Sequence, residues 1–324
     1  MPISGPSSYL PTLDAFLSHW AEANTLIGGG GVVLEDGTTR TALSTLRDNL
    51  DDARDAVADA RVERALARAD LLTKLTALQA RAVEFNARVR GDLPGSGFAE
   101  ALPEAFSVGQ NEAVVREGLR RMAKIWDKIN QLGSTAPPGV SPPYTLSDGY
   151  QLATLDTDRT ALRDAYRALS DADVELTLAR STRNKVQTVI YPKLKSYRQK
   201  IGGYDASYPE LVETLPALTP PDGHTPAAVP AQAVWDAPAV KAKVTWAAST
   251  DTNLMRYEVR GCAGDDYQVE DEIVLATVLP GAARELLTDF ALNTGGLTAG
   301  FKVYVILETG NEKGSEAVYV VRPG

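Results

Sequence analysis

Residues 34–68 read LEDGTTRTALSTLRDNLDDARDAVADARVERALAR, and residues 146–180 read LSDGYQLATLDTDRTALRDAYRALSDADVELTLAR. The two stretches align without a gap at an offset of 112, and 17 of the 35 paired positions are identical. Apolar residues at helical spacing continue past both stretches, which predicts long helices over residues 43–89 and 155–201. The pattern therefore predicts an internal duplication organised around two long helices.

The similarity includes the helix that precedes each long one. WAEANTL at residues 20–26 corresponds to WDKINQL at residues 126–132, at an offset of 106. The difference between the two offsets falls in the connecting loop, which is longer in the second copy. We therefore expect the repeat to be a helix–loop–long-helix hairpin, with first helices over residues 12–26 and 111–132.

Each long helix has a seam of small and apolar residues three and four positions apart, the spacing that coiled-coil-like packing requires. The seams are Leu50, Ala53, Val57, Ala60 and Ala67 in the first helix and Leu162, Ala165, Leu169, Ala172 and Ala179 in the second. Two hairpins that pack on each other would form an elongated four-helix bundle. In the open alternative, the long helices bury their apolar faces in neighbouring subunits. We favour the closed bundle.

The composition changes after the second hairpin. Five prolines between residues 216 and 230 predict a semi-extended linker, and beyond it an alternation of period two predicts about seven short strands of a β-sandwich. The predicted fold class is thus α plus all-β, in several domains. They are hairpin repeat 1 over residues 1–109, hairpin repeat 2 over residues 110–215, a proline-rich linker over 216–231 and the sandwich over 232–324.

The strand region resembles a fibronectin type III domain over residues 234–322. The supporting segments are VTW at 244–246, YEV at 257–259, FKVYVIL at 301–307 and TGNEKGS at 309–315. The chain departs from the family after residue 297, where the family places a corner tyrosine and this chain has Phe301. The resemblance implies a sandwich of the kind that binds proteins or sugars. The helical repeats resemble no family that we can name.

The densest acidic cluster lies between two predicted strands and comprises Asp265, Asp266, Glu270, Asp271 and Glu272. Oxygen ligands in a loop are those that calcium prefers, although the spacing is not that of an EF-hand. We favour a solvated acidic loop, and the sequence leaves open whether the loop at 265–272 binds calcium.

Residues for catalysis or metal binding are sparse. His19 in the first helix and His224 in the linker are the two histidines, and Cys262 is the single cysteine. So few residues, far apart in sequence, argue against a zinc site or a nucleophile triad. We interpret the histidines as helix or surface residues and Cys262 as a strand-end thiol. The prediction is a protein that is not an enzyme, with no catalytic, cofactor-binding or metal-binding residues.

The charge balance bears on partners. The 324 residues carry a formal net charge of −9, so most of the surface would repel a phosphate backbone and no nucleic-acid partner is expected. No apolar run reaches the length of a membrane span, and the first residues show no basic or apolar signal region. We expect synthesis in the cytoplasm, no membrane insertion, and incorporation into a virion or other extracellular assembly.

Two functions fit this pattern. The favoured one is a non-catalytic scaffolding protein, a subunit of an assembled particle or filament such as a phage-like virion component. It would self-associate through the long helices and display the sandwich on a proline-rich stalk. The virion role follows from the resemblance, because such sandwich domains are often appended to virion proteins. The alternative is a surface adhesion or carbohydrate- or protein-binding module, which predicts a monomer and an exposed aromatic patch using Tyr267, Tyr304 or Tyr319.

Overall fold

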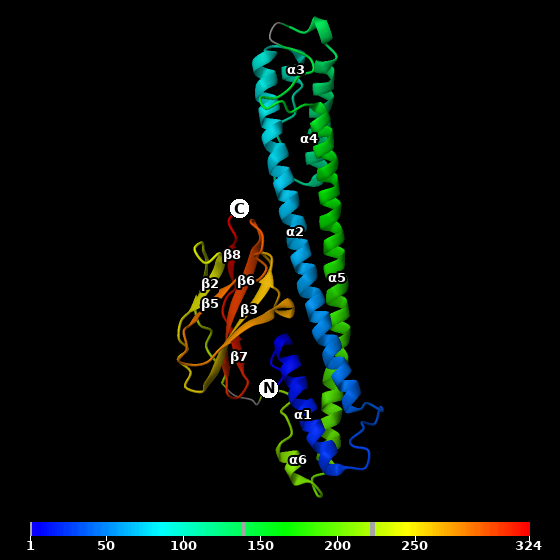
Figure 1. Ribbon diagram of the computed structural model, residues 1–324, viewed down its shortest axis with the longest axis vertical. Coiled ribbons are helices and arrows are strands. Elements are labelled where there is room, and N and C mark those ends of the chain that lie inside the picture. The colour runs from blue at the N-terminus through cyan, green and yellow to red at the C-terminus, as the bar shows by residue number, and fades with distance from the viewer. Residues whose placement is uncertain (1, 138–139, 221–223) are drawn as a thin grey trace. The chain divides into compact units, whose positions relative to one another are not determined.

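A computed structural model describes residues 2–137, 140–220 and 224–324 of the chain (Figure 1). Residues 221–223 of the predicted linker lie outside the described residues. The rest of the linker has no regular secondary structure up to the first strand.

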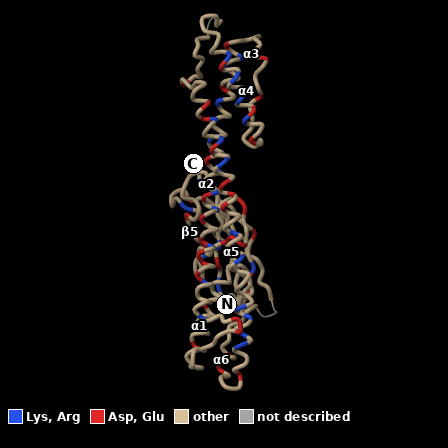
Figure 2. Tube along the Cα trace, turned by 90° about the vertical axis from the view of Figure 1, so that its right-hand side faces the viewer, with Lys and Arg blue, Asp and Glu red and all other residues tan. Residues whose placement is uncertain are grey.

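Two compact units make up the chain. One contains the residues up to Ala65 together with Val174–Gly324, and the other contains Leu66–Asp173. Both long helices, α2 (Arg40–Asp92) and α5 (Leu152–Gly202), contribute a segment to each unit. Charges of both signs are interspersed along these helices, as Figure 2 shows.

The helices form where the apolar pattern predicts them; α2 and α5 extend one to three residues beyond the predicted ends, and α4 is slightly shorter than predicted. The shorter ones are α1 (Tyr9–Ile27), α3 (Gly97–Glu100), α4 (Glu112–Asn130) and α6 (Pro209–Glu213), with 3-10 turns η1 (Pro6–Ser8), η2 (Gly133–Thr135) and η3 (Val269–Asp271). Helix α1 begins before Pro11, because a proline in the first turn removes no intrahelical hydrogen bond. Helix α5 continues through Pro192.

In the unit that contains the termini, α1 packs on the start of α2 and the end of α5. Trp20 is fully buried and stacks on Tyr197 of α5, with ring centroids 4.4 Å apart. The Trp20 indole donates to the carbonyl of Val32 at 3.1 Å, and Asn24 accepts from the amide of Val32 at 2.7 Å. These bonds fix the loop between the two helices to α1.

In the unit formed by Leu66–Asp173, α4 packs on the end of α2 and the start of α5. Trp126 is fully buried and stacks on Phe85 of α2 at 4.7 Å. Its indole donates to the carbonyl of Tyr144 at 2.8 Å, and Asn130 accepts from the amide of Tyr144 at 2.7 Å.

The two cores are therefore built from corresponding contacts. The residues of the shorter helices differ by 106 in number, and those of the loops and long helices by 112, which are the two offsets of the sequence alignment. Each core contains one of α1 and α4, and among the described residues neither core contains both. The closed four-helix bundle that we predicted is thus not the arrangement of either core.

An antiparallel β-sandwich follows the linker (Figure 1). One sheet has the order β1-β2-β5, and the other has the order β4-β3-β6-β7 with β8 also paired to β6. The strands are β1 (Ala231–Asp236), β2 (Lys241–Trp246), β3 (Leu254–Ala263), β4 (Ile273–Val278), β5 (Glu285–Thr288), β6 (Thr298–Leu307), β7 (Glu312–Gly314) and β8 (Val318–Val321). The expected core residues Trp246 and Tyr257 are buried with ring centroids 5.9 Å apart.

The central strands β3 and β6 are buried on both faces. Alternation along β6 would leave one of Phe301 and Tyr304 exposed, yet their exposed fractions are 0% and 7%. On β3, Glu258 and Arg260 point away from the sandwich interior and are also buried. The outer face of this sheet is therefore covered within its own unit, and the display of the sandwich on a proline-rich stalk stays a prediction.

Candidate functional site

The acidic loop between β3 and β4 is not the solvated loop that we predicted. Asp271 and Glu272 are 4% and 0% exposed, whereas Asp265, Asp266 and Glu270 remain on the surface. Burial of a carboxylate is unfavourable unless it is paired and hydrogen-bonded, so the two buried acids require partners.

Asp271 meets three arginines from the long helices. One carboxylate oxygen pairs with Arg61 of α2 at 2.6 Å and with Nε of Arg180 of α5 at 2.8 Å, and the other pairs with Arg183 of α5 at 2.6 Å. The side chains of Arg61 and Arg183 are 5% exposed and that of Asp271 is 1% exposed. We call these four residues the ionic joint, because they connect the sandwich to α2 and α5.

Backbone carbonyls complete the joint. Arg61 Nε donates to the carbonyl of Ala263 in β3 at 3.0 Å. Arg54 donates to the carbonyls of Glu272 at 2.8 Å and Pro6 at 3.0 Å. These guanidinium groups donate to backbone carbonyl oxygens on both sides of the loop, and this fixes the position of the loop on α2.

A second ionic cluster lies beside the joint on the outer face of the sheet. Arg260 is 1% exposed and pairs with Glu258 at 2.8 Å, Glu272 at 2.9 Å and Glu312 at 2.6 Å. Its guanidinium carbon also lies 3.8 Å from the centre of the Tyr304 ring. One arginine therefore neutralises carboxylates from β3, β7 and the acidic loop.

Two tyrosines of the predicted aromatic patch belong to this cluster. The hydroxyl groups of Tyr267 and Tyr304 each donate to Glu272 at 2.9 Å. Of the three tyrosines, Tyr319 alone is well exposed, at 43%. The patch that the binding-module alternative predicted is thus not formed by these residues.

The environment shifts the pKa values of the buried acids in opposite directions. Burial alone would raise the pKa of Asp271, but hydrogen bonds from Arg180 and Arg183 and the positive charge of Arg61 lower it below the ordinary 3.8. Burial raises the pKa of Glu272 above 4.5, although the charge of Arg260 opposes the shift. Asp271 therefore keeps its charge to a lower pH than an ordinary aspartate, whereas Glu272 takes up a proton at a higher pH than an ordinary glutamate.

The helix arginines were visible in the sequence, but their role was missed. Arg61 follows Val57 by four residues, and Arg183 follows Leu176 by seven, so both lie on the buried face of their helices. We had assigned this face to Ala60 and Ala179, which are partly exposed. An arginine at a helix position where an apolar residue is expected could have predicted a buried acidic partner.

The ionic joint is closely packed, and its charged groups bind one another. The space between Arg54, Arg183 and Glu272 does not admit a water molecule. Within the described ranges, no three His, Cys, Asp or Glu side chains are placed to hold a metal ion. Asp271, which a calcium site in this loop would need, has both oxygens engaged by arginines.

The histidines and the cysteine take structural positions. His19 is buried, with its ring nitrogens 2.7 Å from the Tyr197 hydroxyl and 2.9 Å from the carbonyl of Leu211. His224 is exposed and pairs with Asp251 at 2.7 Å. Cys262 is buried on β3, and burial raises the pKa of its thiol to about 12, so the reactive thiolate is scarce at neutral pH.

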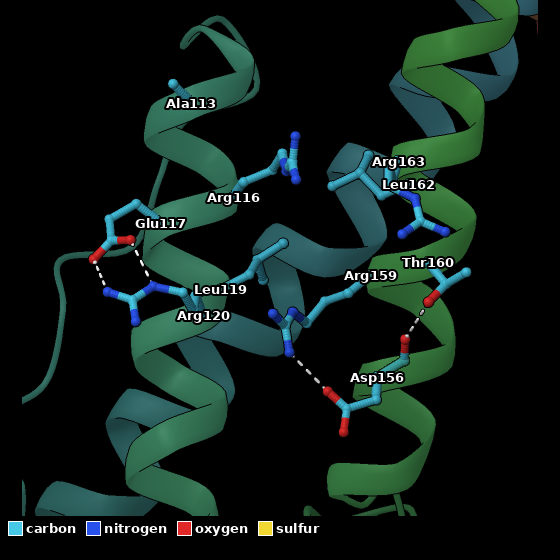
Figure 3. Close-up of a pocket in the computed structure, with 10 residues that line it drawn as sticks. All are labelled: Ala113, Arg116, Glu117, Leu119, Arg120, Asp156, Arg159, Thr160, Leu162 and Arg163. Carbon is cyan, nitrogen blue, oxygen red and sulfur yellow. Dashed lines mark hydrogen bonds and ion pairs between the residues drawn. The ribbon is translucent and has the colours of Figure 1, made fainter.

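A separate groove lies between α4 and α5 in the unit formed by Leu66–Asp173. Its volume is about 650 Å³. Figure 3 shows Arg116 and Arg159 in the space between the two helices, whereas the guanidinium group of Arg120 points away from α5 and pairs with Glu117. We call it the arginine groove. Its lining carries four arginines and two carboxylates, Glu117 and Asp156, so it is basic in a chain of net charge −9.

No protein-family model and no curated protein matches the sequence. The chain is similar over 31% of its length to an Fn3-like protein from Clostridium thermocellum, with 97% of that chain covered, 18% identity and a TM-score of 0.25. Pectate lyase PelI from Erwinia chrysanthemi matches over 29% of this chain and 28% of its own, at 18% identity and a TM-score of 0.24. A myokine structure matches over 32% of this chain and all of its own, at 16% identity and a TM-score of 0.23.

These likenesses are weak and partial. They establish neither a family nor an activity for this chain. Among the helices of the described residues, none is both long and apolar enough to cross a membrane.

The opposite pKa shifts predict how the sandwich responds to acid. A lowered pKa means that the stability from Asp271 is present above about pH 4 and is lost as the pH falls through the lowered value. The raised pKa of Glu272 means that, as the pH falls, this carboxylate is protonated in the folded state before it is protonated in the unfolded state. Acidification towards pH 4.5 therefore does not weaken the fold through Glu272. We expect the free energy of unfolding to stay constant between neutral pH and about pH 4.5 and to decrease when the pH is lowered below 3.8.

Urea unfolding followed by circular dichroism at a series of pH values measures this dependence. Asp271→Asn should remove most of the loss below pH 3.8, whereas Glu270→Gln, a neighbouring exposed acid, should leave it in place. A large loss of stability between pH 7 and 5 in the unmodified protein would contradict the assignment.

Proposed function

We propose that the protein is a non-catalytic structural subunit of an assembled particle or filament, such as a phage-like virion component, which carries a fibronectin type III-like sandwich on a helical body. The ionic joint is the observation that carries this proposal. Asp271 is held by arginines from both long helices, so the sandwich has a defined position on α2 and α5.

A flexible connection would not need such a joint. Buried ion pairs gain little net stability, because the desolvation of both charges offsets their attraction, and they favour one arrangement over its competitors. The linker alone would hold the sandwich near the helices. Four charged side chains that converge between the helices and the loop support a subunit in which orientation matters, as it does in a repeating assembly.

We further propose that the helical body arose by duplication of a helix–loop–long-helix hairpin. The identical positions in the two long helices support this origin. So does the recurrence of the tryptophan stack and of the asparagine–loop bond at the two sequence offsets.

Self-association through the long helices is the assembly mode that we propose. Helix α5 exposes Val174 and Leu178 at 57% and 62%, one turn apart on the same face. Exposed apolar residues that gather on one helix face are typical of contact surfaces. The adhesion alternative has less support, because Tyr267 and Tyr304 are engaged with Glu272.

Light scattering after size exclusion, over a concentration series, tests this function, with negative-stain images of the same fractions. The proposal predicts discrete oligomers or filaments whose mass rises with concentration. A mass of 34.7 kDa at every concentration would contradict self-assembly and would favour the binding-module alternative.

A further inference from the structure

We propose that the arginine groove binds an acidic face of α2 from a second copy of this chain, so that copies join head to tail. This inference rests on the proposed self-association and names its two contact surfaces. The first surface is the groove between α4 and α5, and the second is a stripe of carboxylates on α2 before Ala65.

The groove combines buried apolar residues with exposed charged side chains. Leu119 and Leu162 line it and are each 1% exposed, whereas the side chains of Arg116 and Arg163 are 57% and 52% exposed. This is the composition of a surface that receives a helix with acidic residues, since the floor takes the carbon atoms and the arginines pair with the carboxylates.

The arginines are not required by the helical packing. The positions that correspond to the four groove arginines in the first half of the chain are Leu10, Asp14, Arg47 and Asp51. There Arg47 bridges Asp14 at 3.0 Å and Asp51 at 2.7 Å, so that site neutralises itself. The arginine groove has positive charges at both positions of the Asp14–Arg47 pair, namely Arg120 and Arg159. The second half therefore has two arginines where the first half has one aspartate and one arginine.

The ion pairs that the groove arginines already make are exchangeable. Each groove arginine pairs with a carboxylate of its own helix near the surface, namely Arg116 with Glu112 at 3.0 Å, Arg120 with Glu117 at 2.8 Å, Arg159 with Asp156 at 2.7 Å and Arg163 with Asp164 at 3.6 Å. Exposed pairs of this kind contribute little to stability, because water screens them. An incoming carboxylate can thus replace or share these partners at little cost.

A matching surface exists on α2. The exposed carboxylates Asp48, Asp52, Asp55, Asp59 and Glu63 follow one another at intervals of four, three, four and four residues. That spacing places them on one face of the helix, opposite the buried Leu50, Ala53 and Val57. Among the described residues, Asp52, Asp55 and Asp59 make no ion pair. We call these five residues the acidic stripe.

The two surfaces agree in spacing as well as in charge. The groove arginines are four residues apart on each of two helices, and the stripe carboxylates are three or four residues apart on one helix, so both sets repeat at about 5–6 Å. Because the two surfaces differ, a pair of copies keeps one free groove and one free stripe, on different copies. Such head-to-tail contacts generate rings or filaments.

Two neutralised variants test the contact. The groove variant is Arg116→Gln with Arg159→Gln and Arg163→Gln, and the stripe variant is Asp52→Asn with Asp55→Asn and Asp59→Asn. The control is Arg121→Gln with Arg167→Gln and Arg284→Gln, which removes three exposed arginines outside the groove. Circular dichroism checks that each variant is folded, and light scattering gives its mass at concentrations where the unmodified protein associates.

Each variant alone should associate at least about tenfold more weakly than the unmodified protein and the control. An equimolar mixture should form a 1:1 complex, because the groove variant retains its stripe and the stripe variant retains its groove. If the unmodified protein associates and both variants associate equally well, this inference is wrong and the proposed function stands. If polyglutamate binds to the groove but a second copy of the chain does not, the inference is also wrong. If the unmodified protein stays a monomer, both this inference and the proposed self-assembly are contradicted.

Discussion

Replacing Arg260 with methionine is expected to destabilise the sandwich by about 3–5 kcal/mol, because removal of one partner leaves uncompensated buried charges. Arg260 lies between the carboxylates of Glu258, Glu272 and Glu312, whose side chains are 8%, 0% and 8% exposed, and Glu258 also pairs with Arg256 at 2.9 Å. Methionine fills much of the volume, so the loss measures charge and not a cavity. Urea unfolding at neutral pH, followed by the fluorescence of the sandwich tryptophans, gives the free energy.

Lys243→Met is the matched control, since Lys243 pairs with Glu285 at 2.9 Å on the other sheet and is substantially exposed. It should give no measurable change in unfolding. Adding Glu258→Gln and Glu312→Gln to Arg260→Met should recover part of the lost stability, because the repulsion between buried acids is relieved. An Arg260→Met protein as stable as the unmodified one would show that the cluster is not neutralised in the way described.

Replacing Asp271 with alanine is expected to release the sandwich from the helices while leaving its strands folded. The guanidinium groups of Arg61 and Arg183 would stay buried without their carboxylate, at a cost of about 3 kcal/mol or more. Cys262 reports on this opening, because it lies on the same face of β3 as Arg260 and its Sγ is 3.2 Å from the carbonyl of Gln268 in the loop. A change of that size corresponds to an increase of about 100-fold in the rate of Cys262 alkylation.

Glu270→Gln changes the adjacent, exposed acid and should leave the alkylation rate as it is in the unmodified protein. Circular dichroism should show an unchanged strand signal in the Asp271→Ala protein. If Cys262 reacts equally fast in all three proteins, Asp271 does not close this face of the sheet.

The elements that depend on local periodicity could be predicted from the sequence. The seam residues Leu50 and Leu162 are buried, and Trp246 and Tyr257 pack in the sandwich as the resemblance implied. These residues are placed by helical or strand spacing, which neighbouring residues determine.

The arrangement that depends on distant pairs could not be predicted in the same way. Asp271 looks like a solvated loop residue until Arg61, 210 positions earlier in the chain, is placed beside it. Likewise, α1 and α4 are each amphipathic, and no local signal tells which long-helix segment each one covers. The offsets of 106 and 112 showed which residues of the two repeats correspond. They could not distinguish a closed bundle from the two separate cores, because both arrangements bury the same apolar helix faces.

A pair of spin labels tests most directly whether the sandwich has one position on the helices. Ser181→Cys on α5 and Thr277→Cys on β4 are exposed positions in the same unit, and Cys262→Ser removes the native thiol. The ionic joint predicts a single narrow distribution of distances between the labels, which broadens in the Asp271→Ala protein. A broad distribution in the protein with an intact joint, as a flexible tether over residues 216–230 would give, would contradict the account.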